Sequence, residues 1–174
     1  MRVSPVLPEV RTERLLLRRL WPADREQVVA LYRDAEANRW DPMALTPEQA
    51  RERFTGWLAD WDEYGLSYWI AVDPASGDVV GLGGIRRHVE DGEPVLNLAY
   101  RLHRRHWGKA YATEIARQAV EWAEREMPGR PVSIVTTPEY APSLRVAEKL
   151  GFTVWRERTQ HGFIEVLLRR HAHG

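Results

Sequence analysis

The sequence predicts an α/β domain of the α+β type, with a mixed, mostly antiparallel sheet flanked by helices. The predicted elements run in the order strand, two helices, three strands, helix, strand, helix and two strands. Short turn signals, Gly77-Asp78 and Asp91-Gly92, separate the three consecutive strands, which suits antiparallel hairpins. The length of 174 residues suits one domain over residues 1–174.

The first part of the chain predicts a strand followed by two helices. Residues 13–19 are a short apolar run between charges, which is typical of a strand. Residues 24–37 repeat apolar side chains at helical spacing. The second helix has a capping signal, with Thr46 as N-cap, Pro47 at the first helical position and Gln49 three residues after the cap. We expect this helix to end near Glu63, before Gly65.

The middle of the chain predicts three strands, over residues 67–73, 78–86 and 94–102. The middle strand contains three glycines, at positions 81, 83 and 84. Glycine inside a strand often marks a bulge or a place where another group approaches the backbone closely. We therefore expect one of these two features in this strand.

The last part predicts the clearest helix and a closing hairpin. Residues 109–126 carry an apolar stripe at positions 112, 115, 116, 119, 120 and 123. Residues 131–137 form a β-branched run that indicates a buried strand. Residues 142–150 predict a short helix that stops at Gly151. Two strands, residues 152–158 and 163–168, then close the chain as a hairpin.

Composition excludes several function classes. Lys plus Arg equals Asp plus Glu at 25 each, whereas a nucleic-acid partner usually demands a basic excess. The chain has no Cys, which removes disulfides, thiolate chemistry and Cys-based zinc sites, and we expect no metal. Residues 1–11 lack the apolar core of a signal peptide, and no apolar run approaches the roughly 18 residues of a membrane span. These features predict a cytoplasmic protein with no membrane partner.

The stretch over residues 97–114 carries the chemical signal. A strand runs into a basic, glycine-containing turn, and the turn opens the long helix. Such a helix start presents unpaired backbone N–H groups and a partial positive charge, which suits a pyrophosphate. Gly108 and Ala110 let an anion approach the backbone, while Arg104, Arg105 and Lys109 add positive charge.

Three blocks of sequence resemble one family. Arg105-x-x-Gly108-x-Ala110 resembles the (Gln/Arg)-x-x-Gly-x-(Gly/Ala) coenzyme A signature of the GNAT superfamily of N-acetyltransferases. Residues 100–114, 11–18 and 143–152 resemble the branch that contains ribosomal-protein N-terminal acetyltransferases. The similarity spans about residues 11–168, and the predicted order of elements also matches the GNAT fold.

The resemblance implies acetyl-CoA as co-substrate. In the family, a bulge in the strand before the signature splays two neighbouring strands and exposes backbone groups that bind the pantetheine arm. The matching positions are Tyr100, Arg101 and Leu102. Main-chain N–H groups of the signature would hold the pyrophosphate, and the matching residues are Arg105, His106, Trp107, Gly108, Lys109 and Ala110, followed by Tyr111 and Ala112.

Around the thioester, the chain both matches the family and departs from it. The family places an Asn and, three residues later, a Ser near the thioester; here these positions hold Tyr140 and Ser143. Some relatives carry a catalytic Tyr where this chain has Ala147. The implied reaction is direct attack of a neutral amine on the thioester, polarised by a backbone N–H. Ser143 is the first candidate to protonate the leaving thiolate and Tyr140 the second; helix capping is the alternative role of Ser143.

The base and the acceptor pocket stay open at this level. Many relatives use a Glu as base at the position of Asn97, which cannot serve. Candidates are His88, Glu93 and Glu139, or a relay through water. We expect the early helices, residues 38–46 and the final hairpin near His161 to form the pocket. Its candidate lining residues are Trp40, Asp41, Trp57, Trp61, Asn97 and Trp107, with Asp41 facing a cationic amine and core packing as the alternative for each aromatic residue.

The acceptor is an amine, either a protein N-terminus or a small molecule such as an aminoglycoside. Another acyl-CoA as donor is a further alternative. The residues at 140 and 97 favour a second class, a non-catalytic coenzyme A-binding or sensor module. A third class, a nucleic-acid binder, would use Arg101, Arg104, Arg105 and Lys109. Family members often pair, so the resemblance leaves a homodimer open.

Overall fold

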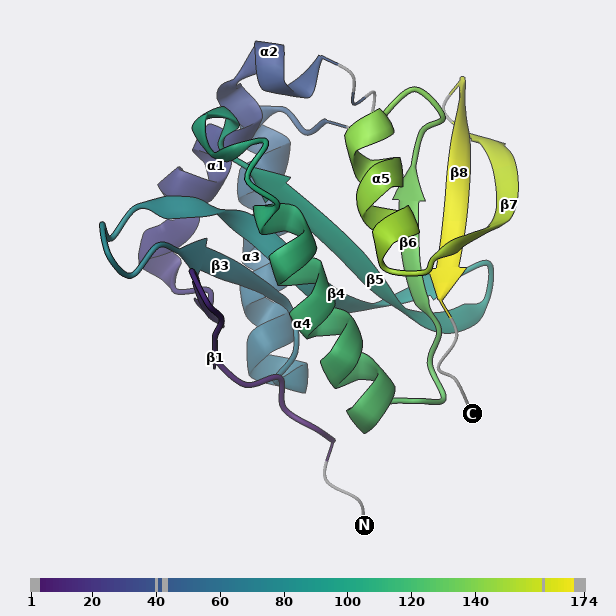
Figure 1. The fold of residues 1–174 in the computed structure, drawn as a ribbon, viewed down its shortest axis with the longest axis horizontal. Helices are drawn as coiled ribbons and strands as arrows, with labels where there is room; N and C mark the ends of the chain where they lie inside the picture. Colours follow the sequence, from purple (N-terminus) through teal and green to yellow (C-terminus); the bar gives the residue numbers. More distant parts are fainter. Residues whose placement is uncertain (1–3, 40, 42–43, 161, 171–174) are drawn as a thin grey trace.

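The computed structural model describes residues 4–39, 41, 44–160 and 162–170 and contains one eight-stranded sheet over this part of the chain (Figure 1). The strand order is β1-β2-β3-β4-β5-β6-β8-β7. All neighbouring strands are antiparallel except β5 and β6, which are parallel. The predicted fold class is confirmed. The strands are β1 (Val10–Arg11), β2 (Leu16–Arg19), β3 (Tyr68–Val72), β4 (Val79–Glu90), β5 (Glu93–Leu102), β6 (Val132–Thr136), β7 (Thr153–Gln160) and β8 (Phe163–Arg170).

Helices cover both faces of the sheet. In Figure 1, α4 and α5 lie in front of the sheet, while α1 and α3 lie behind it. A continuous apolar core fills the space between the sheet and these helices. The helices are α1 (Arg25–Arg33), α2 (Ala35–Asn38), α3 (Pro47–Tyr64), α4 (Tyr111–Glu126) and α5 (Ala141–Lys149), with two short 3₁₀ turns, η1 (Pro22–Asp24) and η2 (Arg104–His106).

Helix α3 confirms the capping signal. The Thr46 hydroxyl accepts a hydrogen bond from the Gln49 N–H at 3.2 Å, and the Thr46 N–H donates to the Gln49 side chain at 2.9 Å. Gly65 ends the helix in the left-handed conformation, with φ of 65°. The local signals therefore set both ends of α3 to within one residue of the prediction.

The glycines of β4 permit close approach, and the register of β4 against β3 shifts next to Gly81. A Cβ at Gly81 would lie 2.3 Å from the Arg101 carbonyl oxygen, and one at Gly83 would lie 2.9 Å from a methyl of Ile115. The ladder between β4 and β5 keeps one register from Gly81↔Leu102 to Glu90↔Glu93. On the other side of β4, Ala71 of β3 pairs with Gly81 but Val72 pairs with Val79, a register shift typical of a β-bulge, so both expectations hold for this strand.

The sheet opens between β5 and β6 without the expected bulge. These strands pair only at Leu96↔Val132 and Asn97↔Ser133, after which they diverge. Because β5 keeps its register with β4, the bulge expected in β5 is absent from that ladder, and the prediction was wrong on this point. The opening lies beyond these two pairs, where β6 no longer pairs with β5 but continues its antiparallel pairing with β8 as far as Thr136.

No helix among the described residues has the length and apolar character needed to cross a membrane. In the same part of the chain, no group of three or more His, Asp or Glu side chains is arranged to hold a metal ion.

Candidate active site

Two cavities meet at the opening of the sheet. The first, the α4–α5 cavity, has a volume of about 360 Å³ and lies between the end of β5, the start of α4 and α5. The second, the α3–β8 cavity, has a volume of about 490 Å³ and is lined by α3, β4, β5, β6 and the β7–β8 hairpin. Four residues line both: Tyr100, Arg101, Tyr140 and Ser143. The two cavities are therefore neighbours at these residues.

The start of α4 leaves backbone donors facing the α4–α5 cavity. Gly108 and Ala110 both have positive φ, at 76° and 61°, and Ala110 caps the helix without a side-chain hydrogen bond. The first bond inside the helix runs from the Glu114 N–H to the Ala110 carbonyl. The N–H groups of residues 111–113 therefore have no acceptor within the helix. Left-handed residues next to such donors create a concave anion site.

The left-handed Ala110 also explains why the helix starts later than expected. The sequence predicted a helix from Lys109, whereas α4 begins at Tyr111. The turn before it is the 3₁₀ turn η2, in which the Trp107 N–H donates to the Arg104 carbonyl at 3.1 Å.

The N-terminal segment fixes the first turn of α4. Arg14 Nε donates to the Glu114 carboxylate at 2.8 Å, and the Thr12 hydroxyl donates to the other oxygen of the same carboxylate. The Arg14 guanidinium also lies 4.2 Å from the centre of the Tyr111 ring. Thr12 and Arg14 belong to the block over residues 11–18, and Glu114 belongs to the block over residues 100–114. Both blocks resemble the family, and these bonds let the N-terminal block hold the start of α4 in place.

Positive charge surrounds the same helix start. Arg145 and Lys149 line the α4–α5 cavity from α5, and neither has an ion pair within the described residues. Arg105 and Lys109, predicted as cofactor contacts, are exposed and lie outside the cavity lining; Arg105 donates weakly to the Val79 carbonyl at 3.5 Å.

His106 is the one buried side chain of the signature turn. It is 8% exposed, and neither ring nitrogen has a hydrogen-bond partner in the described part of the chain. Burial lowers the pKa of His106, and the charges of Arg105 and Lys109 lower it further. The ring is therefore neutral at pH 7 and contacts the Tyr111 ring edge to face, with centres 6.0 Å apart.

The unpaired edge of β5 faces the cavity with main-chain groups of alternate residues. The Leu96 N–H donates to Pro131 across the sheet at 2.9 Å, so by strand alternation the N–H groups of Tyr100 and Leu102 point the same way. At these positions β6 no longer pairs with β5, so the two N–H groups have no partner on β6. The Arg101 carbonyl instead points at β4, next to Gly81. Arg101 therefore contributes its side chain to the site, and the expectation of a free main chain there was wrong.

Hydroxyl groups cluster where the cavities meet. The Tyr100 hydroxyl donates to the Ser143 carbonyl at 3.1 Å and lies 3.1 Å from Ser143 Oγ. Tyr140 holds the N-cap position of α5 without a side-chain cap, and Ser143 is inside the helix, so Ser143 does not act as the cap. Burial raises the pKa of Tyr100 to about 12 and also raises that of Tyr140. Both phenols keep their protons at neutral pH and can donate them.

The α3–β8 cavity is rich in arginine. Its lining includes four arginines and two carboxylates, namely Arg53, Arg86, Arg101, Arg158, Asp41 and Glu165. Three of the arginines are paired. Arg101 bonds to Asp41 and to Asn38, Arg86 lies 3.2 Å from Asp60, and Arg158 donates to Glu165 at 2.7 Å. The carboxylate of Asp41, which we expected to face a cationic amine, thus pairs with Arg101.

The other predicted acceptor residues divide between cavity and core. Trp57 and Asn97 line the α3–β8 cavity, and the Asn97 side chain accepts a hydrogen bond from the Tyr68 hydroxyl at 2.6 Å. Trp61 is core, with its indole N–H bonded to the Tyr68 carbonyl at 2.8 Å. Trp107 lines the other cavity. Trp40 and His161 lie outside the described residues.

Among the three candidate bases, the structure brings one into the site. His88 lines the α3–β8 cavity. Glu93 lies at the far end of β5 and accepts from Arg169 at 2.7 Å, whereas Glu139 is exposed and lines neither cavity. Burial lowers the pKa of His88, and the charge of Arg86 lowers it further, so its imidazole is neutral at pH 7.

Sequence reasoning missed several lining residues, above all the arginines at 53, 86 and 158 and the carboxylate of Glu165. The register offered one signal, because Arg86 pairs with Asn97 and therefore shares its face of the sheet. Arg158 likewise pairs with Glu165 in the predicted hairpin. Arg53 lies on the exposed side of α3, where no sequence pattern marks it.

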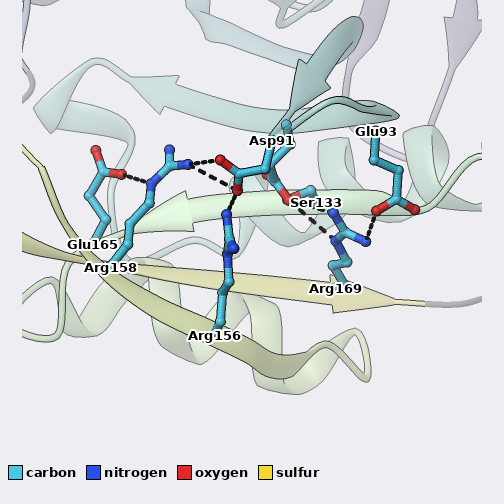
Figure 2. Close-up of polar contacts among 8 residues, drawn as sticks. Asp91, Glu93, Ser133, Arg156, Arg158, Glu165 and Arg169 are labelled. Atoms are coloured by element: carbon cyan, nitrogen blue, oxygen red, sulfur yellow. Dashed lines mark hydrogen bonds and ion pairs between the residues drawn. The ribbon is translucent and has the colours of Figure 1, made fainter.

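An ion-pair network reaches the lining of the α3–β8 cavity at Arg158 and Glu165. Figure 2 shows Arg158 between Glu165 and Asp91, with Arg156 also on Asp91 and Arg169 on Glu93. Arg169 further donates to Glu90 at 2.8 Å, and both side chains are almost completely buried. The network ties the β4–β5 turn to the hairpin that closes the cavity.

Comparison with known proteins places this chain among the acetyltransferases. The family model named acetyltransferase (GNAT) domain matches residues 14–153 of the sequence, and the chain belongs to this family. The protein YkkB of Bacillus subtilis (strain 168), described as uncharacterized, is 31% identical over 148 residues, which cover 80% of this chain and 82% of YkkB. A GnaT-family protein from Bordetella pertussis has a similar structure, with a TM-score of 0.80, 25% identity and coverage of 94% and 99% of the two chains.

Two solved structures share the fold at lower identity. The structure of yncA from Salmonella typhimurium, with its cofactor acetyl-CoA, gives a TM-score of 0.70 at 17% identity and covers 92% of this chain and 95% of its own. The ribosomal-protein-S5-alanine acetyltransferase from Vibrio fischeri gives 0.72 at 17% identity, covering 95% and 97%. The chain is an enzyme of the acyltransferase class with the acetyltransferase fold.

Proposed function

We propose that the chain is an N-acetyltransferase that transfers the acetyl group of acetyl-CoA directly to a primary amine within one domain. The observation that carries this proposal is the meeting of the two cavities at Tyr100, Arg101, Tyr140 and Ser143. Because the cavities share these residues, a thioester in one would lie next to an amine in the other. Direct transfer needs such a contact and no covalent enzyme intermediate.

Acetyl-CoA fits the α4–α5 cavity. The N–H groups of residues 111–113 would bind the diphosphate, with Arg145 and Lys149 adding positive charge. The pantetheine arm would bind the free edge of β5 at Tyr100 and Leu102, in the way a peptide adds to a sheet edge. The structure of yncA, a protein of the same fold, contains its cofactor acetyl-CoA, which supports acetyl-CoA as the co-substrate.

The chemistry follows from the groups around the meeting point. The amine attacks the thioester carbonyl, whose developing negative charge a β5 backbone N–H would stabilise. The bond from carbonyl carbon to sulfur breaks, and the thiolate takes a proton from Ser143 or Tyr140. The amine loses its own proton to His88, directly or through water.

Replacing Ser143 by Ala is expected to lower kcat by roughly tenfold and to leave the KM for acetyl-CoA within about twofold. A thiol of pKa near 8.5 leaves readily without help, so the loss falls below the roughly hundredfold typical of a general acid. Thiol release from acetyl-CoA in the presence of an amine panel measures both values. No thiol release by the wild type with any amine, although acetyl-CoA binds, would favour a non-catalytic coenzyme A-binding module instead.

The pH dependence should report His88. Since the His88 pKa lies below its usual 6.5, the ring is neutral at pH 7 and can act as a base. It becomes protonated, and unable to act as a base, only at acidic pH. We therefore expect kcat/KM to fall as the pH drops below about 6.5. Protonation of the amine, with a pKa near 8, also lowers kcat/KM, so His88→Gln should lose only the additional fall below about pH 6.5, and its rate should be lower at pH 7. An unchanged additional fall in the variant would remove His88 as the base.

The acceptor proposed is a protein N-terminal α-amine or a small-molecule amine. An α-amine of pKa near 8 is more often neutral at pH 7 than a lysine of pKa near 10.4 and so needs less help from a base. The sequence blocks described above and the shared fold of the ribosomal-protein-S5-alanine acetyltransferase support the protein N-terminus. The size of the α3–β8 cavity, about 490 Å³, suits a small molecule equally well.

A further inference from the structure

We infer that the acceptor amine carries a carboxylate and that Arg53 binds this carboxylate in the α3–β8 cavity. The inference rests on the proposed function, because it specifies the chemistry of the second substrate. It also excludes a class considered above, since it predicts that polycationic amines such as aminoglycosides are poor acceptors.

The first argument is the charge of the lining. Asp41 and Glu165 are each bonded to a lining arginine, Arg101 and Arg158 respectively. Arg86 is paired with Asp60, which does not line the cavity. Arg53 is left, and within the described residues it makes no hydrogen bond or ion pair. A cavity with an unpaired guanidinium and no unpaired carboxylate selects a ligand with negative charge.

The second argument is where the charges converge. The cavity groups around His88 are arginines: Arg86 on the same strand, Arg158 from β7 and Arg53 from α3, opposed by Glu90. Arg53 thus lines the cavity from the exposed side of α3, and its charge contributes to lowering the pKa of His88. The charge of Arg53 also acts to lower the pKa of Tyr32 and Tyr68, which line the same cavity.

The third argument is a buried hydroxyl without a partner. Thr137 lines the α3–β8 cavity and is 6% exposed, and its Oγ1 makes no hydrogen bond within the described residues. A buried hydroxyl normally has a partner, because leaving it unpaired costs free energy. A polar ligand in this cavity would supply one.

The positive lining also fits the chemistry of transfer. Positive charge near an ammonium group lowers its pKa and increases the fraction of neutral, nucleophilic amine. The same charge would repel a substrate whose only ionic group is the ammonium. A carboxylate on the substrate offsets this repulsion at Arg53 while the amine still loses its proton near His88.

The test uses three probes that share one α-amine and one α-amide: glutamate α-amide, glutamine α-amide and lysine amide. They differ only in the side chain, which is anionic, neutral or cationic. We expect wild-type kcat/KM to be roughly tenfold higher for glutamate α-amide than for glutamine α-amide, the size expected for one charge-assisted hydrogen bond, and lowest for lysine amide. Peptides that begin with Glu or Gln repeat the comparison and show whether the carboxylate comes from a protein N-terminus or a small molecule.

The variant Arg53→Gln should bring the ratio of the two kcat/KM values close to one. Arg51→Gln is the matched control, since Arg51 lies on the same helix, bonds to Glu48 at 2.6 Å and does not line the cavity. The control should keep the wild-type ratio. A wild-type preference for the neutral or cationic probe, or a ratio that survives Arg53→Gln, would overturn the inference.

A binding measurement separates this inference from the proposed function. If no probe releases thiol, the proposed function fails, and calorimetry of glutamate α-amide with the coenzyme A complex decides the inference. Saturable binding that Arg53→Gln weakens roughly tenfold would support it. Equal binding of the two variants, or no binding to the wild type, would overturn it. Thiol release with no preference among the probes contradicts the inference and leaves the proposed function standing.

Discussion

Gly108→Val is expected to weaken acetyl-CoA binding by about a hundredfold. Gly108 has φ of 76°, a conformation that a β-branched residue adopts only at a cost of about 1–3 kcal/mol. The turn would relax to another shape, and the N–H groups of residues 111–113 would lose their common direction. A hundredfold loss corresponds to about 2.7 kcal/mol of binding free energy, and titration calorimetry with acetyl-CoA measures it directly.

Gly92→Val is the matched control for this variant. Gly92 has φ of 83° and open space around its Cα, as Gly108 does, but it lies in the β4–β5 turn at the opposite end of β5. Both variants should therefore lose similar stability, while Gly92→Val keeps wild-type affinity for acetyl-CoA. Equal loss of affinity in the two variants would mean that strain, and not the position of the turn, is responsible.

Arg169→Met should lower the free energy of unfolding by about 3–5 kcal/mol. Arg169 is 3% exposed and donates to Glu90, which is 2% exposed, at 2.8 and 3.2 Å. The variant leaves the Glu90 carboxylate buried with only the Ser133 hydroxyl, which donates to it at 2.7 Å. A buried carboxylate without its cation is costly, because desolvation is no longer compensated. Urea unfolding followed by circular dichroism measures the loss.

Two further variants make this expectation specific. Arg125→Met removes an exposed ion pair with Glu126 and should cost less than about 1 kcal/mol. The double variant Glu90→Leu with Arg169→Met should recover part of the loss, since it removes the buried charge together with its partner. A double variant as unstable as Arg169→Met alone would show that the cost comes from packing and not from the stranded carboxylate.

Local patterns predicted the elements of this fold well, for physical reasons. The Thr46 capping box and Gly65 set the ends of α3 through bonds within a few residues, so nearby sequence carries the information. The apolar stripe of α4 likewise became buried residues such as Ile115, Ala116 and Ala119. The opening between β5 and β6 depends on where two strands far apart in sequence stop pairing, and no local pattern encodes that point.

The parts of the candidate site that lie in continuous motifs could be predicted, whereas contacts between residues far apart in sequence could not. The signature turn, Ser143 and Tyr140 were found because each lies in a continuous motif, and the structure brings them to one opening. The bond between Arg101 and Asp41 was missed, because it joins residues on different elements. Similarly, the predicted hairpin pairs Arg158 with Glu165, but only the folded chain shows that these side chains line the α3–β8 cavity.

The central claim is that acetyl-CoA lies in the α4–α5 cavity, with its diphosphate on the α4 start and its arm along β5. Amide chemical shifts followed by NMR during an acetyl-CoA titration test this most directly. We predict saturable shifts of the backbone N–H groups of Gly108, residues 110–113, Tyr100 and Leu102, with little change at Gly92. Shifts confined to other parts of the sheet, or no saturable shift at all, would contradict the claim.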